Sequence, residues 1–255
     1  MAEPRRGPLR VATLNLWGRF GDWPRRLETL RATWPAVDAD VLLLQEVWTS
    51  PERDQVAQTA AALGYPHAVR GLAVPEAPGG RDLETVAILS RLPLRDPVVT
   101  VLPHSHPLRS RVAATVEHPR SALTAACGHT VFTPPALCHA QVGAVVDLQG
   151  SPAVVGGDLN APDDVVLPLA AGQHLVDTLA GDVVPTWPVD REAFRRGWIE
   201  RVGAEPTFSL TPRRLDYVLC RGAVAVAAGV DPLRDPRTGV PASDHAAVWA
   251  DLRLP

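Results

Sequence analysis

Residues 153–160 read AVVGGDLN, an apolar run that ends in an aspartate and an asparagine. Ala153 to Gly157 is typical of a short buried strand, so Asp158 and Asn160 stand where that strand leaves the core. Other apolar segments meet polar groups in the same way, at Asn15 in TLNLWG, Glu46 in LLLQEV, Asp216 in RRLDYV, and Asp244 and His245 in SDHAAV. This repeated pattern predicts that the chemistry lies at strand ends.

The order of the expected elements favours a layered α/β protein. Strands are predicted at residues 9–17, 41–45, 84–90, 97–102, 110–117, 121–132, 153–157, 214–220, 223–230 and 245–253. Helices are predicted from Trp23, from Ser50 to Gly64, and from Thr133 to Leu148, while residues 181–212 are expected to be irregular. Successive strands between residues 84 and 132 break the strict alternation of a doubly wound parallel sheet. We therefore predict an α/β sandwich with two sheets, as a single domain over residues 1–255 with a flexible segment at 1–8.

The composition is that of an ordinary globular protein. Of 255 residues, 46% are hydrophobic and 21% are charged, which is enough to bury a large core. The longest apolar runs, such as Val41 to Leu44, are far shorter than the roughly 20 residues of a membrane span, and the first residues contain no secretory apolar region. Three cysteines without metal-type spacing indicate neither a disulfide framework nor structural zinc. These features favour a cytoplasmic monomer without stable membrane insertion.

The charge balance is mildly acidic, because 25 basic residues, all of them arginine, face 28 acidic residues and leave a net charge of −3. Proteins that hold long nucleic acids electrostatically usually carry a basic excess, so this balance disfavours a DNA-coating protein but leaves room for a local basic groove. Asparagine occurs only at positions 15 and 160, in a composition that indicates a GC-rich coding sequence. Asn15 and Asn160 therefore stand out as residues that serve a specific task.

The residue types at the strand ends suit phosphoester hydrolysis. Glu46 and Asp244 offer hard carboxylate oxygens of the kind that bind Mg²⁺ or Mn²⁺. Asp158 can orient or deprotonate a water, and His245 can bind a phosphoryl oxygen or exchange a proton. Asp216 can fix the tautomer of His245. Each residue alone has a structural explanation, as a turn former or a helix cap, but together they predict metal-assisted attack of water on phosphorus.

The motifs TLNLWG, LLLQEV, GGDLNAP, RRLDYVL and SDHAAV, in this order, resemble those of the endonuclease/exonuclease/phosphatase superfamily. That superfamily includes deoxyribonuclease I, apurinic-site endonucleases, neutral sphingomyelinases and inositol-polyphosphate 5-phosphatases. The resemblance runs from about Leu9 to Leu252, and GDLN, RLDY and SDH are its most specific parts. It implies a four-layer α/β/β/α sandwich, in which two mixed β-sheets pack face to face and the site lies at one end of both sheets.

The resemblance also implies a role for each matching residue. Glu46 corresponds to the principal ligand of Mg²⁺ (or Mn²⁺), assisted by Asn15 and Asp244. Asp158 and Asn160 correspond to the pair that orients the nucleophilic water and holds the phosphoryl group. The motifs RLDY and SDH supply Asp216 and His245 as the paired carboxylate and imidazole.

Two motifs of this sequence differ from the family pattern. Glu84 begins ETVAILSR, where the family has E-G-x-A-I-L-S-R, so threonine replaces the usual glycine. We assign Glu84 to substrate binding. The T-H-L motif, whose histidine contacts the scissile phosphate, is matched only by Gly128-His129-Thr130. We assign His129 to that catalytic role, and the alternative is a histidine at a strand end without substrate contact.

Two further residues are assigned to substrate binding. Trp17, two residues beyond Asn15, can stack on a ring, although packing is the alternative explanation. Arg214 belongs to an arginine pair after the irregular segment and can grip a phosphate. The expected function is a Mg²⁺-dependent phosphoesterase acting on a nucleic acid, a nucleotide or a small phosphorylated molecule, because fold and site do not fix the substrate. The alternative is a family member that keeps the metal site for non-hydrolytic binding or for another Lewis-acid reaction.

Overall fold

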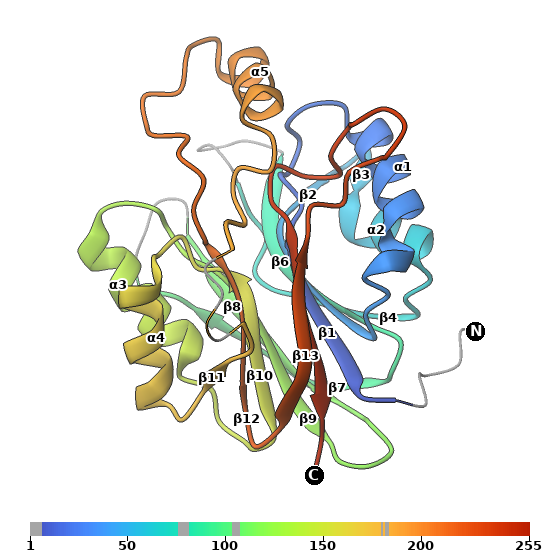
Figure 1. Cartoon of the computed structure of the whole chain (residues 1–255), viewed down its shortest axis with the longest axis vertical. Coiled ribbons are helices and arrows are strands. Elements are labelled where there is room, and N and C mark those ends of the chain that lie inside the picture. Colours follow the sequence, from blue (N-terminus) through green and yellow to red (C-terminus); the bar gives the residue numbers. More distant parts are fainter. Residues whose placement is uncertain (1–6, 76–81, 104–107, 180, 182–183) are drawn as a thin grey trace.

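The computed structural model describes residues 7–75, 82–103, 108–179, 181 and 184–255. Most of the predicted N-terminal segment, residues 1–6, lies outside the described residues, whereas Gly7 and Pro8 are exposed bends. The described chain forms two mixed β-sheets that pack face to face, with helices on both outer faces (Figure 1). The predicted fold class, a four-layer α/β/β/α sandwich, is confirmed.

The first sheet contains β1 (Leu9–Asn15), β2 (Val41–Ser50), β3 (Arg53–Asp54), β4 (His67–Arg70), β5 (Val74–Pro75), β6 (Leu83–Ser90), β13 (Val224–Asp231) and β14 (Ala247–Arg253). Its order is β13-β14-β1-β2-β6-β4, with β3 beside β2 and β5 beside β6. The second sheet contains β7 (Leu94–Val101), β8 (Ser110–Val116), β9 (Leu123–His129), β10 (Ala153–Asp158), β11 (Val176–Asp177) and β12 (Asp216–Arg221), in the order β11-β12-β10-β9-β8-β7. Only β1–β2 and β9–β10 pair in parallel among these neighbours.

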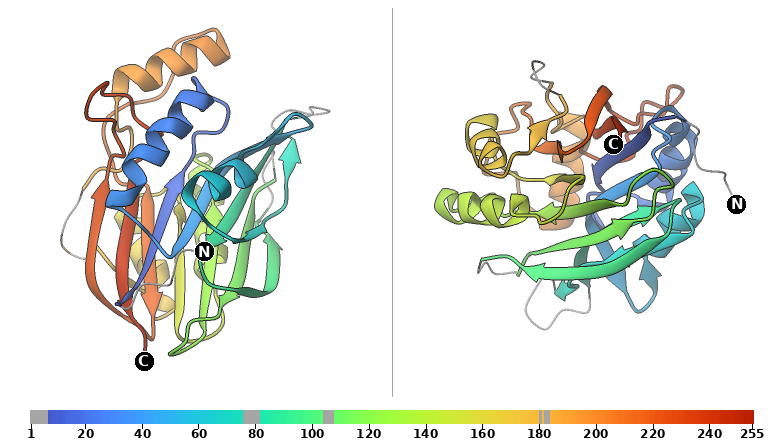
Figure 2. Two further views of the ribbon diagram at one scale, coloured as in Figure 1. Left: turned by 90° about the vertical axis from the view of Figure 1, so that its right-hand side faces the viewer. Right: turned by 90° about the horizontal axis from the view of Figure 1, so that it is seen from below.

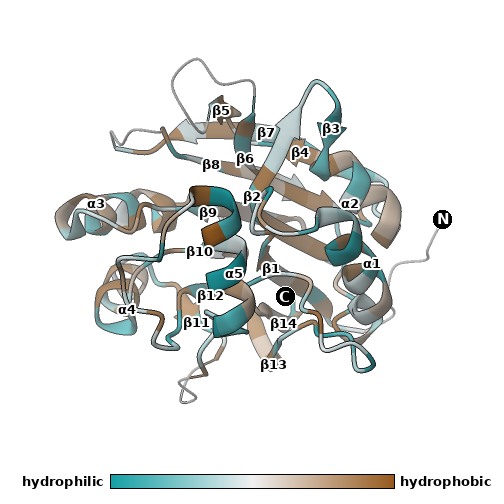
Figure 3. Cartoon of the chain, turned by 90° about the horizontal axis from the view of Figure 1, so that it is seen from above, coloured by the Kyte–Doolittle hydropathy of each residue, from teal (hydrophilic) through white to brown (hydrophobic). Residues whose placement is uncertain are grey.

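The helices cover the sheets from outside. Those of the described chain are α1 (Trp23–Thr33), α2 (Gln55–Leu63), α3 (Pro135–Val146), α4 (Asp163–Gly172) and α5 (Arg191–Val202), with a 3₁₀ turn at Trp34–Ala36. The first sheet is covered by α1 and α2, and the second by α3 and α4. The fifth helix, α5, lies apart from these layers, above one end of both sheets (Figures 2 and 3). None of the described helices is long and apolar enough to cross a membrane.

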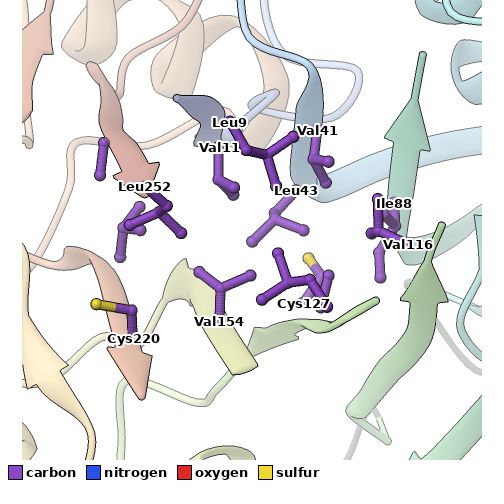
Figure 4. Packing of buried hydrophobic residues seen from close by; sticks show 14 of the residues in the cluster. Leu9, Val11, Val41, Leu43, Ile88, Val116, Cys127, Val154, Cys220 and Leu252 are labelled. Carbon is purple, nitrogen blue, oxygen red and sulfur yellow. The ribbon is translucent and has the colours of Figure 1, made fainter. Parts of the chain in front are cut away.

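The main apolar layer lies between the sheets, because alternate residues of each central strand point toward the opposite sheet. Val11 and Leu43 from the first sheet pack there against Cys127 and Val154 from the second (Figure 4). All four side chains are fully buried. A closely packed interior of this kind fixes the position of one sheet relative to the other, and so fixes which strand ends face each other.

The predicted helices differ from the structure in three places. The second helix begins at Gln55 rather than Ser50, because β2 continues to Ser50 and the side chain of Asp54 caps α2 by accepting from the amide of Ala57. Helix α4 is not predicted from the sequence, and it contains an internal proline, Pro168. Helix α5 lies inside the segment expected to be irregular.

Gly157 allows β9 and β10 to approach at the edge where the site lies. A Cβ atom at Gly157 would lie 1.9 Å from the carbonyl oxygen of Gly128, which is a backbone atom and cannot rotate away. We therefore predict that Gly157→Ala lowers the free energy of unfolding by about 3 kcal/mol or more, at the upper end of overpacking costs. Urea denaturation measures this change.

Gly143 provides the matched control, since it lies within α3 and a Cβ there would meet nothing within 4 Å. Gly143→Ala should raise the free energy of unfolding by about 0.5–1 kcal/mol, because alanine has the higher helix propensity. Wild-type stability of Gly157→Ala would contradict the close approach of β9 and β10.

Candidate active site

Strand direction and register bring the polar residues together at one edge of the sandwich. Parallel strands end at the same edge, and antiparallel neighbours begin there. In the second sheet, Asp158 at the end of β10 stands opposite His129 at the end of β9 and opposite Asp216 at the start of β12. In the first sheet, Asn15 at the end of β1 stands opposite Gln45 of β2. The predicted strand-end groups therefore face one another across the two sheets.

Glu46 reaches the site through a bulge in β2. The pairing of β2 with β6 shifts between Leu44 and Val47, and Glu46 adopts a left-handed backbone with φ of 47°. Gln45 turns inward instead, where its amide bonds Thr13 and the carbonyl of Leu43. Such a conformation costs a non-glycine residue about 1–3 kcal/mol and is found most often at functional sites. The bulge directs the Glu46 carboxylate toward the strand ends.

Asn15 joins the two sheets through its side-chain amide. Its Nδ2 donates to Glu46 Oε1 at 2.9 Å and to Asp158 Oδ2 at 3.1 Å. Its Oδ1 accepts the backbone N–H of Trp17 at 2.8 Å, which fixes the orientation of the amide. The nitrogen of Asn15, rather than the oxygen that a cation would need, therefore faces the carboxylates. In this orientation Asn15 links Glu46 to Asp158, and the ligand role that the resemblance implies stays a prediction.

Asp158 lies at the centre of the site and is 2% exposed. Its Oδ1 accepts the backbone N–H of Asn160 at 3.0 Å, and Asn160 has a left-handed φ of 46°. Its Oδ2 lies 3.5 Å from Nε2 of His129 and 3.7 Å from Nε2 of His245. The carboxylate thus stands between the two imidazoles on one side and Asn15 on the other.

The donor set around Glu46 fits a hard divalent cation. Glu46, His129 and Asp158 each have one potential ligand atom within 4.8 Å of the others. The sequence does not predict Asp158 as a metal ligand beside Glu46. Burial, the Glu84 carboxylate and the more distant Asp244 raise the pKa of Glu46 to about 7, even though His129 opposes the shift. Burial likewise raises the pKa of Asp244. Clustered carboxylates with raised pKa values are the environment that a cation stabilises.

His245 and Asp216 form the hydrogen-bonded pair that the proposed chemistry requires. Nδ1 of His245 lies 2.8 Å from Oδ2 of Asp216, and both side chains are buried. Burial alone would lower the pKa of His245, but the carboxylates of Asp216, Asp244 and Asp158 hold it well above its usual value. These carboxylates therefore favour the protonated imidazole, whose Nε2 is directed toward Asp158.

Thr186 supports this pair and is not predicted from the sequence. Its hydroxyl donates to Asp216 Oδ2 at 2.6 Å and accepts the backbone N–H groups of Leu215 and Asp216 at 3.0 and 3.2 Å. Asp244, beside His245, accepts the indole N–H of Trp187 at 2.8 Å. The loop before α5 therefore holds both carboxylates on the imidazole side of the site.

His129 has a carboxylate and a guanidinium beside it. Arg109 forms an ion pair with Glu84, and its Nη1 lies 2.7 Å from Nδ1 of His129. Burial would raise the pKa of Glu84, but the Arg109 guanidinium brings it down to about 2. Nδ1 of His129 also lies 3.3 Å from Oε1 of Glu84. Its Nε2 faces Asp158 and lies 3.3 Å from Nδ2 of Asn160, so contacts on both nitrogens hold the ring. Arg109 is a site residue that the sequence analysis does not identify.

A pocket of about 350 Å³ opens above these groups. Glu46, His129, Asp158, Asp244 and His245 form its floor. Its sides carry an aromatic wall, which consists of Trp17, Phe20, Phe132, Trp187, Phe194, Trp198 and Phe208. Successive rings of the wall contact each other at centroid distances of 5.0–6.4 Å. Phe194 and Trp198 of α5 pack within this wall, and Figure 3 shows α5 above the ends of the sheets.

The two remaining substrate-binding assignments, Trp17 and Arg214, occupy different positions. Trp17 lines the pocket but is 6% exposed, because its ring stacks inside the aromatic wall. Arg214 is not among the lining residues: it donates to both oxygens of Asp177 at 2.8 and 2.7 Å and stacks on Tyr217. Its neighbour Arg213 lines the pocket instead. Arg214 precedes β12, and its ion pair with Asp177 holds its guanidinium outside the pocket lining.

The sequence profile of the Endonuclease/Exonuclease/phosphatase family matches residues 12–245. No curated protein sequence matches the chain. Among solved structures, the endonuclease/exonuclease/phosphatase from Beutenbergia cavernae is similar, with a TM-score of 0.74 and 26% identity over 98% of this chain and 72% of that chain.

Two further structures share the fold at lower identity. The endonuclease/exonuclease/phosphatase family protein from Leptotrichia buccalis has a TM-score of 0.75 and 15% identity, over 96% of this chain and 100% of that one. TDP2 of D. rerio, complexed with single strand DNA product, has a TM-score of 0.73 and 16% identity, over 96% of this chain and 99% of that one. These likenesses support the architecture independently of the motifs.

Thr186 offers a test of how the Asp216 carboxylate is held. Thr186→Val keeps the shape but removes the hydroxyl that serves Asp216 and two backbone N–H groups. We predict a loss of about 1–3 kcal/mol in the free energy of unfolding, the cost of leaving buried polar groups unpaired. Chemical denaturation checks the value. Thr207→Val, at an exposed position, should stay within about 0.5 kcal/mol of wild type, and an equal loss in both variants would contradict the role of Thr186.

Proposed function

Because the chain belongs to the endonuclease/exonuclease/phosphatase family, we propose that it is a divalent-metal-dependent phosphoesterase with Mg²⁺ or Mn²⁺ as its cation. The observation that carries this proposal is the convergence of two sets of groups on one pocket. Glu46 and Asp158 offer clustered carboxylates, and His245 offers an imidazole held by Asp216 at 2.8 Å. Anionic oxygens for a cation and cationic donors for a phosphate are the complementary parts of such a site.

The carboxylates are the groups suited to hold the cation. We assign this role to Glu46 and Asp158, with Asp244 nearby, since they provide hard oxygens on the pocket floor. When bound, Mg²⁺ or Mn²⁺ supplies Lewis-acid polarisation of a phosphoryl oxygen. Asn15 keeps Glu46 and Asp158 at hydrogen-bonding distance from one nitrogen, and so holds them together against their mutual repulsion.

The imidazole side is suited to stabilise the negative charge that develops on the phosphoryl oxygens. Protonated His245 presents Nε2 to the pocket while Asp216 holds Nδ1, so the ring can donate a hydrogen bond or pass a proton. His129 also directs its Nε2 toward Asp158, at 3.5 Å from Oδ2. We assign to Asp158 and Asn160 the orientation of the attacking water for in-line attack on phosphorus, because both residues line the pocket and are joined by a hydrogen bond.

The substrate is proposed only as a phosphoester, of the nucleic acid, nucleotide or small-molecule type. The net charge of −3 favours a short substrate over a long nucleic acid held by electrostatics. One of the similar structures, TDP2 of D. rerio, contains a single strand DNA product, so short oligonucleotides belong in a substrate panel. Plasmid, abasic DNA, sphingomyelin and inositol phosphates complete that panel.

Cation binding gives a test that does not depend on turnover. We predict that Glu46→Gln loses more than about tenfold in affinity for Mn²⁺ and Mg²⁺, because an amide replaces the carboxylate at the floor of the pocket. Calorimetric titration measures the affinity. Glu28→Gln, on the exposed face of α1, is the control and should bind like wild type. Unchanged affinity in Glu46→Gln would remove Glu46 as a principal ligand.

Turnover of bis(p-nitrophenyl) phosphate tests the reaction and the His245–Asp216 pair together. Activity should need Mg²⁺ or Mn²⁺ and vanish with EDTA. We predict that His245→Ala lowers turnover by about 100-fold or more, the scale of a lost acid–base or oxyanion contact. Asp216→Asn should cost nearly as much, and the double variant little more, because the two residues act as one unit.

Two results would count against this proposal. Additive losses in the double variant would show that Asp216 and His245 do not act as one unit. Cation binding without turnover on any member of the panel would favour a non-hydrolytic use of the same site.

A further inference from the structure

The aromatic residues of this chain are concentrated at one place. All four phenylalanines and three of the seven tryptophans belong to the aromatic wall of the pocket. Packing alone does not account for this arrangement, since Phe132 is 49% exposed and Phe20, Trp198 and Phe208 are only partly buried. The wall therefore presents ring faces to the pocket as well as to itself.

Arg213 adds an unpaired cation to this wall. Its guanidinium lies 4.8 Å from the ring of Trp187 and 5.1 Å from that of Phe132, so cation–π contacts hold it in place. No carboxylate of the described residues forms an ion pair with Arg213, and its buried Nε has no hydrogen-bond partner there. The adjacent Arg214, by contrast, is neutralised by Asp177. A held but unpaired arginine beside the pocket floor is suited to bind an anion.

Trp198 supplies a second unsatisfied donor. Its indole Nε1 is buried and has no hydrogen-bond partner among the described residues. Buried donors are normally paired, and Trp198 is one of the residues that line the pocket. Arg213 and Trp198 therefore provide two donors set among aromatic faces in one pocket.

From these observations we propose that the pocket is a subsite for a flat aromatic ring attached to the substrate's phosphate, and that Arg213 binds an oxygen of that phosphate. The proposal deepens the proposed phosphoesterase function, on which it rests, by naming the class of group carried by phosphorus. The ring would stack on the aromatic wall, and a polar atom on its edge would accept from Trp198. Base or aryl rings share this chemistry, because each offers a π-face.

The shape and polarity of the pocket favour a ring over the other common groups on phosphorus. A sugar would need several polar partners for its hydroxyls, whereas the wall offers mainly ring faces. A long acyl chain would need an extended apolar groove, whereas this pocket is compact at about 350 Å³. Offset-stacked and edge-to-face contacts stabilise a flat ring beyond the burial of its area.

Non-hydrolysable phosphonates test the ring subsite without turnover. Phenylphosphonate and cyclohexylphosphonate present rings of similar size, but only the first has a π-face. We expect phenylphosphonate to bind about fivefold tighter to the wild-type protein in Mg²⁺, as measured by calorimetry. Methylphosphonate should bind more weakly than both. Equal affinities for the two rings, or no binding of either, would overturn the proposal.

Two variants locate the contacts. Phe208→Leu keeps apolar bulk and should bring the phenyl-to-cyclohexyl ratio close to one, while leaving methylphosphonate binding unchanged. Arg213→Gln should weaken all three phosphonates by about tenfold or more, because a charge-assisted hydrogen bond is lost. Arg196→Gln, on the exposed face of α5 and outside this pocket, should bind like wild type. If Arg213→Gln also binds like wild type, Arg213 is not the phosphate ligand.

A competition experiment identifies the source of the ring. A nucleoside phosphonate, whose base is one sugar away from phosphorus, is titrated against bound phenylphosphonate. Displacement at comparable concentrations supports a nucleobase in the subsite, and failure to displace supports an aryl group bonded directly to the phosphate oxygen. These measurements record binding, so they test the ring subsite separately from the phosphoesterase proposal. A phenyl preference without any turnover would reject the phosphoesterase proposal and keep the ring subsite. Turnover without the phenyl preference would reject the ring subsite and keep the phosphoesterase proposal.

Discussion

The amide of Asn15 is the contact on which the site depends, because one nitrogen serves a carboxylate from each sheet. It donates to Glu46 of the first sheet and to Asp158 of the second, and the backbone N–H of Trp17 fixes its direction. An aspartate at position 15 would add a third negative charge where a donor is needed. The scarcity of asparagine in the sequence and the contacts at the strand ends thus both identify Asn15 as a residue with a specific task.

Carboxylates and cationic side chains occupy different parts of the pocket. Burial raises the pKa values of Glu46 and Asp244, and neighbouring carboxylates add to both shifts. The surrounding carboxylates raise the pKa of His245 and so favour its protonated form, and Arg213 has no ion-pair partner among the described residues. A cation and an anionic phosphate together would neutralise both sides. Because the cation would neutralise the carboxylates and the phosphate would neutralise the cationic side chains, the electrostatics of the pocket favour binding both together.

The strand-end residues could be predicted because a buried strand is a run of apolar residues in the sequence, with a polar residue where the strand enters or leaves the core. Asp158 and His245 belong to such runs, and the structure brings them to one pocket. Thr186 and Arg109 leave no such trace, because their contacts depend on the path of a loop and on register between distant strands. Helix α5 is obscured by the prolines and tryptophans around it, although its capping residues, an aspartate and a glycine, are visible in the sequence.

Helix α5 is attached to the protein by side chains rather than by its backbone. No other described helix or strand packs closely along it, and Gly197 lets the ring of Trp17 lie directly against its turns, where a Cβ would be 2.6 Å away. The sandwich below holds Asp158, His129 and Asp216 through strand register, in which the residues of α5 itself take no part. Residues of α5 can therefore change what the pocket accepts, provided that the preceding loop keeps Thr186 on Asp216 and Trp187 on Asp244.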